Sequence, residues 1–213
     1  MRTEDLIRSL GEELRPVPRG AVARRIAIGM AGGAIVTLAL VLCCLGMRPD
    51  MMSAMAGSPF WMKWGYTILL DLVAIAAVLH LSRPQAMRPR WLWLLWVPVG
   101  VLALLTGREM LIMPMDGWHQ LWTGHSWRVC SMLVAMLSLP ILAGLLWSFR
   151  QLAPTRLRLT GALAGLAAGA CAATLYGLHC QESSALFILT WYSLGIAMVV
   201  ALGALVGPKL LRW

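Results

Sequence analysis

Seventeen of the 18 lysine and arginine residues of this chain lie outside six long apolar segments, and Lys63 lies near the beginning of the second segment. Most of these segments reach the roughly 20 residues that a helix needs to cross the hydrocarbon core of a bilayer. We therefore predict an all-α fold, a six-helix transmembrane bundle. The predicted spans cover residues 26–47, 61–81, 91–106, 129–149, 159–178 and 185–206. The third is the shortest and contains Pro98.

The basic residues are distributed unevenly between the two sides of the predicted membrane. Only Arg48, Lys63, Arg108 and Arg128 fall on one side, and the remaining lysines and arginines fall on the other. Because loops with an excess of basic residues stay in the cytoplasm, we expect both termini to be cytoplasmic. The chain then divides into a cytoplasmic tail over residues 1–25, a membrane domain over 26–208 and a cytoplasmic C-terminus over 209–213.

A net charge of +9 is also typical of proteins that bind nucleic acid. Here the basic residues flank apolar spans and do not cluster on a soluble domain, so we expect no direct nucleic-acid binding and a lipid bilayer as the surroundings. A cleavable signal peptide is not expected either, because the first apolar segment starts after residue 25 and five more follow it.

The tail has the periodicity of a short amphipathic helix. Thr3 is a suitable N-cap, and Glu4 and Asp5 follow in the first turn, where the helix dipole favours negative charge. Pro16 and Pro18 end the helix before the membrane. Its apolar face consists of Leu6, Ile7, Leu10 and Leu14.

About three turns of helix are not stable alone, so we expect this tail to fold against another surface. One candidate is the inner face of the membrane, where the arginines would help binding. The other is a groove on a soluble partner protein. The acidic first turn favours a basic protein over an anionic bilayer.

The five cysteines contain no Cys-x-x-Cys pair, which argues against a zinc knuckle or a thioredoxin-like motif. Cys43, Cys44 and Cys171 lie inside apolar spans, where cysteine usually packs as a small hydrophobic residue. Cys130 and Cys180 differ, because they lie at the outer ends of the fourth and fifth spans. We expect a soluble metal, oxidant or thiol to reach them there.

Two kinds of chemistry remain open for this cysteine pair. The sulfurs can form a disulfide if their Cα atoms come within about 7 Å, and the oxidising outer compartment favours that state. They can equally ligate a soft cation together with a further side chain. We take His179 as the first candidate for that ligand, and the others are His125, His119 and Glu182.

Small residues recur at every fourth position of the fifth span. A ridge of this kind lets a neighbouring helix backbone approach closely, so we predict helix packing there and, as a hypothesis, a surface along which a helix slides. The ridge is compatible with a dimer and with a monomeric bundle. It consists of Gly161, Gly165, Gly169, Ala173 and Gly177.

Asp71 is a lone carboxyl at membrane depth, for which we expect a structural role as a protonated or hydrogen-bonded group.

Several motifs together resemble the NrsF family, and the resemblance runs from end to end. They are Thr3-Glu4-Asp5-Leu6-Ile7 with Pro16-Val17-Pro18, Phe60-Trp61-Met62-Lys63, Trp127-Arg128-Val129-Cys130, the run 176–183 followed by Phe187, Trp191 and Tyr192, and the closing segment 207–213. The resemblance implies a multi-pass protein of the bacterial inner membrane. It also implies an anti-sigma factor for a sigma factor of the extracytoplasmic-function type.

In that family the cytoplasmic N-terminus is thought to hold the sigma factor, and two outer-facing cysteines are implicated in sensing heavy metals or oxidants. By position these correspond to Cys130 and Cys180. The resemblance thus implies no enzyme and no cofactor, apart from a transient heavy-metal ion at the sensor cysteines. The alternative is a membrane thiol oxidoreductase that passes electrons to a quinone, although such enzymes usually use close-spaced cysteine pairs. A transporter would need more polar groups in its spans.

Overall fold

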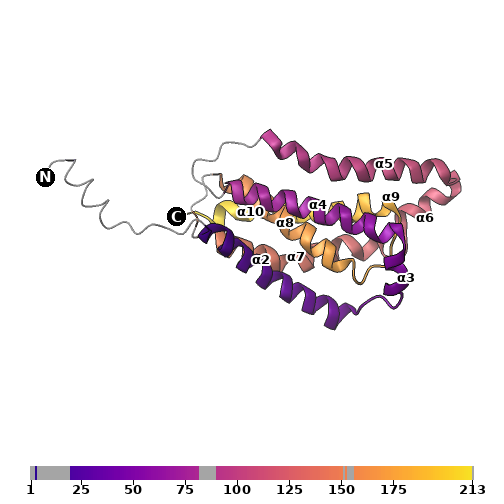
Figure 1. The fold of residues 1–213 in the computed structure, drawn as a ribbon, viewed down its shortest axis with the longest axis horizontal. Helices are drawn as coiled ribbons and strands as arrows, with labels where there is room; N and C mark the ends of the chain where they lie inside the picture. The colour runs from indigo at the N-terminus through magenta and orange to yellow at the C-terminus, as the bar shows by residue number, and fades with distance from the viewer. Residues whose placement is uncertain (1–2, 4–19, 82–89, 151, 153–155, 213) are drawn as a thin grey trace.

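The computed structural model describes residues 3, 20–81, 90–150, 152 and 156–212. Within this part of the chain all regular structure is helical, and six helices are long and apolar enough to cross a membrane (Figure 1). This confirms the predicted all-α bundle. The predicted tail helix, with Leu6, Ile7, Leu10 and Leu14, lies outside the described residues.

The six spans run side by side between two ends of the bundle (Figure 1). Their bounds are Ala21–Leu45, Ser58–Leu81, Trp91–Ile112, Met115–Phe149, Leu157–Tyr176 and Ala185–Leu210. The main helices are α2 (Ala21–Leu40), α4 (Ser58–Leu81), α5 (Trp96–Ile112), α7 (Trp127–Phe149), α8 (Leu157–Tyr176) and α10 (Ser193–Leu210). Single-turn π-helical segments extend α2 and precede α10, namely η1 (Val41–Leu45) and η4 (Ile188–Tyr192).

Short helices close one end of the bundle, which we call the thiol end because it holds Cys130 and Cys180. They are α3 (Met51–Ala56), η3 (Met115–Gly117), α6 (Trp118–Thr123) and α9 (Ala185–Phe187). Helix α2 begins and helix α10 finishes at the opposite end (Figure 1).

The third span is longer than the sequence predicted. It begins with the 3-10 turn η2 (Arg90–Leu95) and continues through α5 to Ile112, whereas we expected it to end at Thr106. The expectation was wrong because the apolar segment was ended before Gly107, whereas the helix continues through Arg108 and Glu109. Glu109 accepts hydrogen bonds from the Ser184 hydroxyl at 3.0 Å and the Leu186 backbone N–H at 3.2 Å, so the helix keeps this charge inside its last turns.

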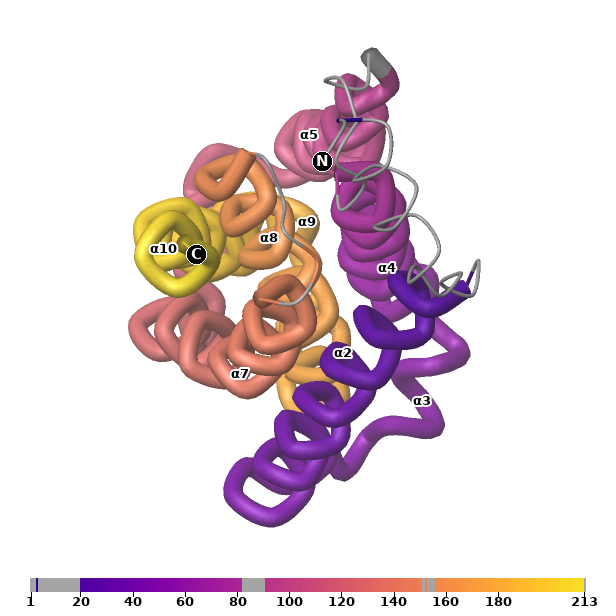
Figure 2. Tube along the Cα trace, turned by 90° about the vertical axis from the view of Figure 1, so that its left-hand side faces the viewer, coloured from indigo at the N-terminus to yellow at the C-terminus, as the bar shows by residue number. Residues whose placement is uncertain are grey.

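Helix α8 occupies the centre of the bundle. It packs most extensively against α10 and also contacts α4, α7 and α2, and Figure 2 shows these helices around it. Most of α8 is buried, in keeping with its many alanines and glycines. Helix α5 lies at the periphery beside α4 and α9. The loop that follows α8 must therefore cross the middle of the thiol end.

Glycines bring the backbones of α8 and α10 into direct contact. A Cβ atom on Gly161 would overlap the backbone of Gly203, and one on Gly165 would overlap the Val199 carbonyl. A Cβ on Gly169 would lie 3.2 Å from Ile196. This close approach increases van der Waals contact, which is a main source of helix association in lipid.

The fourth glycine of the predicted ridge faces a different helix. A Cβ on Gly177 would lie 3.0 Å from Nε1 of Trp64 on α4. An α-helix has 3.6 residues per turn, so positions four apart rotate by roughly 40° at each step around the axis. The ridge therefore starts on the α10 side of α8 and ends on the α4 side.

A second glycine contact joins α2 to α7. Cβ atoms at Gly29 and Gly144 would overlap the opposite backbone. Two hydroxyls bridge the same pair of helices: Thr37 donates to the Leu137 carbonyl at 2.8 Å, and Ser148 donates to the Arg25 carbonyl at 3.0 Å. Helix α7 is thus fastened to α2 at several points between Arg25 and Thr37.

We expect Gly161→Ala to destabilise the bundle by about 1–3 kcal/mol, because the added methyl group has to push the α10 backbone away. Gly32→Ala on α2 is the matched control, since nothing lies near its Cβ position. Thermal unfolding in detergent measures the difference. Equal midpoints for the two variants would contradict the close α8–α10 contact.

Candidate functional site: a buried thiol pair

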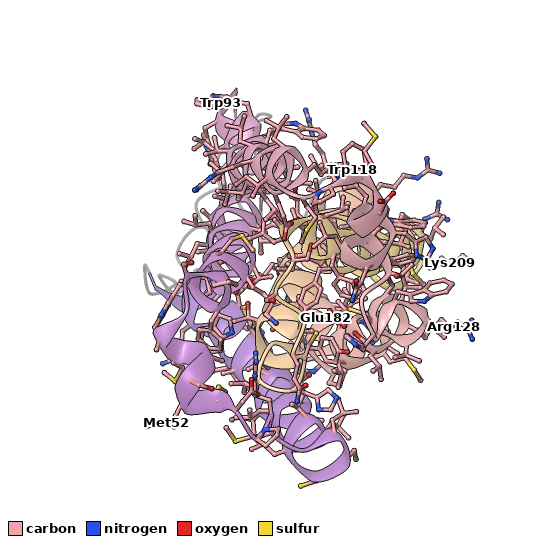
Figure 3. The ribbon with its side chains drawn as sticks, turned by 90° about the vertical axis from the view of Figure 1, so that its right-hand side faces the viewer. Met52, Trp93, Trp118, Arg128, Glu182 and Lys209 are labelled. Carbon is pink, nitrogen blue, oxygen red and sulfur yellow. The ribbon has the colours of Figure 1, made fainter. Side chains whose placement is uncertain are left out.

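The loop after α8 is hydrogen-bonded to α4, to α5, to the beginning of α7 and to the segment that follows α2. We call residues 177–184 the thiol loop. Its chain turns directly out of the helix, because the backbone N–H groups of His179 and Cys180 both donate to the Tyr176 carbonyl at 3.0 Å. Figure 3 shows Glu182 of this loop near the middle of the end-on view.

One side of the thiol loop is fixed to the segment that follows α2. The Arg48 backbone N–H donates to the Leu178 carbonyl at 3.1 Å, and Nδ1 of His179 lies 3.0 Å from the Gly46 carbonyl. Gly46 has φ of 77°, a conformation that glycine adopts without strain. The Arg48 side chain pairs with Asp50 at 2.7 Å, which raises the pKa of Arg48 and lowers that of Asp50.

The other side is fixed to α7. The Glu182 carboxylate accepts hydrogen bonds from the His125 backbone N–H at 2.6 Å and from the Ser126 hydroxyl at 3.3 Å. Both donors stand at the beginning of α7, where a negative charge is favoured by the helix dipole. Glu182 therefore fixes the thiol loop to the helix that carries Cys130.

This arrangement brings Cys130 and Cys180 together. Cys130 lies in the first turn of α7, and its thiol is in hydrogen-bonding contact with that of Cys180. Both cysteines are free thiols. The Tyr176 hydroxyl contacts both sulfurs, and the Tyr176 and Tyr192 rings lie 5.8 Å apart beside them.

The expected solvent access to these cysteines is wrong. Cys130 is 0% exposed and Cys180 is 4% exposed, so neither side chain is open to solvent. A reagent must therefore reach them through a local opening of the loop. A cavity of about 390 Å³ opens beside the loop between α4 and α5, and its lining includes Met62, Arg108, Glu109 and Ser183.

The surroundings favour the thiolate form of Cys180. The hydrogen bond with Cys130 lowers the pKa of Cys180, burial opposes this effect, and the positive charge of Lys63 lowers the pKa further. The thiolate is the form that attacks oxidants and binds metals. Because the pKa is lowered, this form is present at neutral pH and is lost as the pH falls through the folded-state value.

The candidate metal ligands do not all point to the thiol pair. Among the described residues there is no group of three or more histidine, cysteine or acidic side chains that could hold a metal ion. His179 is directed to Gly46, while His119 and His125 are exposed. The pair itself offers two sulfur ligands. The ligand set of Cys130, Cys180 and His179 stays a prediction.

The other singled-out residues lie elsewhere in the bundle. Cys43 and Cys44 are exposed on η1, and Cys171 is half-buried on α8. One carboxylate oxygen of Asp71 is buried and has no hydrogen-bond partner in the described part of the chain.

Sequence reasoning missed Lys63, which it treated as one charge near a span end. Its ammonium group donates to the Cys180 carbonyl at 2.8 Å and to the Glu182 carbonyl at 2.9 Å, and it lies 5.7 Å from the centre of the Tyr192 ring. The available signal was a lysine inside an apolar helix, since a charge in such a place needs a specific partner.

Comparison with known proteins identifies the family of this chain. The family model described as "Negative regulator of sigma F" matches residues 10–213. The chain belongs to the NrsF family. It is 41% identical to the "Probable anti-sigma-F factor NrsF" of Azospira oryzae and 40% identical to the "Anti-sigma-F factor NrsF" of Caulobacter vibrioides. Both alignments cover 100% of each chain.

These NrsF relatives carry the names of regulatory proteins and not of enzymes. No solved structure matches the chain.

We expect a two-electron oxidant such as diamide to form one intramolecular disulfide between Cys130 and Cys180. Peptide mass spectrometry after alkylation should find Cys43, Cys44 and Cys171 still reduced. The reaction should slow as the pH falls, because protonation of Cys180 removes the attacking thiolate. Oxidation that spares Cys130 and Cys180 would contradict the pairing.

Proposed function

We propose that this chain is a multi-pass anti-sigma factor of the bacterial inner membrane that holds an extracytoplasmic-function sigma factor. It releases the sigma factor when a heavy metal or an oxidant engages Cys130 and Cys180. The observation that carries the proposal is the contact between these two thiols at one end of the bundle. The names of its NrsF relatives support the regulatory role.

The distribution of charge supports a cytoplasmic position for the end opposite the thiols. The basic residues near that end include Arg24, Arg25, Arg150, Arg156, Arg158, Lys209 and Arg212. An excess of arginine and lysine is retained on the cytoplasmic side during insertion. The tail that precedes α2 is then available to a cytoplasmic sigma factor.

The sigma factor is held by the apolar face of the tail, formed by Leu6, Ile7, Leu10 and Leu14. Full burial of one such side chain contributes about 1.5–3 kcal/mol, so burial of the four favours the ordering of the helix on its partner. An amphipathic helix seated in an apolar groove is a common recognition mode.

Helix α7 offers a direct connection between the thiols and the tail. It carries Cys130 in its first turn and Ser148 in its last, and Ser148 donates to the carbonyl of Arg25 at the start of α2. The Arg25 guanidinium also lies 5.6 Å from the centre of the Trp147 ring. A movement of α7 driven by its thiol end therefore acts on the residue that adjoins the tail.

The energy required for this switch is modest. A tenfold change in sigma-factor affinity corresponds to about 1.4 kcal/mol, which the inducer must supply by binding the two states of the bundle differently. Coordination by two cysteine sulfurs exceeds this amount.

Removing residues 2–14 should abolish capture of the sigma factor in co-purification from membranes, because the apolar face is lost. Leu6→Glu with Leu10→Glu should do the same, whereas Arg8→Ala with Glu12→Ala on the other face should retain capture. A truncated chain that still captures the sigma factor would refute the tail as its binding site. An oxidoreductase would keep its activity without the tail.

The single variants Cys130→Ser and Cys180→Ser should keep repression and lose induction by Cd²⁺, as measured with a reporter for the sigma factor. Neither change touches the tail, and each removes one of the two sulfurs. Cys171→Ser is the control and should respond normally. Normal induction in the Cys130 or Cys180 variant would exclude the thiol pair as the sensor.

A further inference from the structure

Lys63 is the one charged side chain among the described residues that is buried inside a predicted span, with 1% of its surface exposed. Removing an ammonium group from water is costly unless hydrogen bonds replace its hydration. A lysine kept in such a place on α4 therefore has a specific set of partners. Those partners belong to the thiol loop and not to α4.

Both hydrogen bonds of Lys63 end on backbone carbonyls of the thiol loop. The acceptors are Cys180 at 2.8 Å and Glu182 at 2.9 Å, more than a hundred residues away in the sequence. A lysine ammonium has three donors at one point, so it can bind two carbonyls that converge on it. The backbone between these carbonyls is then fixed relative to α4.

This contact lies at the residue that carries one of the two sulfurs. Cys130 is held by α7, whose beginning is fixed to Glu182 through His125 and Ser126. Cys180 sits on the loop, and its carbonyl is anchored by Lys63. Without that anchor the loop keeps its attachments on both sides, and Cys180 keeps its N–H bond to Tyr176, but the Cys180 carbonyl is no longer held to α4.

We propose that Lys63 is a positioning residue of the thiol pair, and that it holds the Cys180 sulfur where one bridging electrophile engages both thiols at once. The ligand class is a soft cation or a trivalent arsenical, each of which forms two bonds to sulfur. The inference rests on the proposed function in treating this pair as the sensor. The inference makes α4 a part of the proposed sensor, beside the thiol loop and α7.

A competing account gives Lys63 only a structural role in filling the interior. Lys63→Met keeps the length and most of the volume of the side chain but cannot donate to the carbonyls. Lys63→Arg keeps the donors. If Lys63 only fills space, Lys63→Met should behave as wild type. If Lys63 positions the thiol loop, Lys63→Arg should behave as wild type and Lys63→Met should not.

The test uses the full-length reduced protein in detergent and phenylarsine oxide as the probe. Its arsenic forms bonds to two thiol sulfurs and loses its oxygen as water, without any change in oxidation state. Binding is measured as the protection of Cys130 and Cys180 from alkylation, read by peptide mass spectrometry. No sigma factor is present, so the outcome does not depend on capture.

We expect Lys63→Met to bind phenylarsine oxide about tenfold or more weakly, because the second sulfur no longer lies within reach of the first. Lys63→Arg should stay close to wild type. Tyr66→Phe is the matched control: it removes the 2.7 Å hydrogen bond between Tyr66 of α4 and Ser193 and leaves the thiol loop untouched. It should bind the probe normally.

Unchanged binding by Lys63→Met would overturn the proposal. Alkylation of Cys171 reports whether each variant keeps the packed bundle. If Lys63→Met loses that packing, Lys63→Gln replaces it in the test, because the glutamine amide is too short to bind both carbonyls. Weak binding by the glutamine variant with intact packing supports the proposal, and binding equal to wild type overturns it.

Discussion

The direct contact of α8 with α10 determines where the thiol pair lies. Gly161 and Gly203 let the two backbones touch, and this contact sets α8 in the middle of the bundle. The chain that leaves α8 must then cross the centre of the thiol end (Figures 2 and 3). A loop in that position is within reach of α4, α5, α7 and the segment after α2. Hydrogen bonds from each of them converge on residues 177–184, because a buried backbone carbonyl or carboxylate requires a partner.

The hydrogen bonds that meet on the thiol loop leave the thiol pair buried and place it next to several helices. Cys180 belongs to the loop, and Cys130 belongs to α7, so a bond that joins the two sulfurs adds a second link to the one that Glu182 makes between the loop and α7. Burial restricts access to small reagents and to moments when the loop opens. Packed interiors move between discrete arrangements and do not deform continuously, so under the proposed function a small change at the sulfurs would shift α7 relative to α2. The Ser148 contact with Arg25 lies at its other end.

The sequence predicted the six spans, because apolar length and the placement of arginine follow directly from the energetics of the bilayer. It ended the third span too early, since the contact that accommodates Glu109 comes from Ser184 and Leu186, which are distant in the chain. The glycine spacing indicated close packing but not the change of neighbour at Gly177, which depends on where α4 lies. The lysine inside an apolar span was visible in the sequence, but its partners on the thiol loop were not, because they are defined only by the fold. Burial of the cysteines likewise follows from the path of the loop and not from their position near span ends.

The most direct test of this account is a titration of the purified complex between the full-length chain and its sigma factor with Cd²⁺. The released sigma factor is measured by size-exclusion chromatography. The account predicts release that is complete at about one Cd²⁺ per chain, because the two sulfurs act on a single ion. It also predicts no release from a complex in which Cys130 and Cys180 are both serine. Equal release from that complex, or retention of the sigma factor while Cd²⁺ occupies both sulfurs, would contradict the coupling between the thiol pair and the tail.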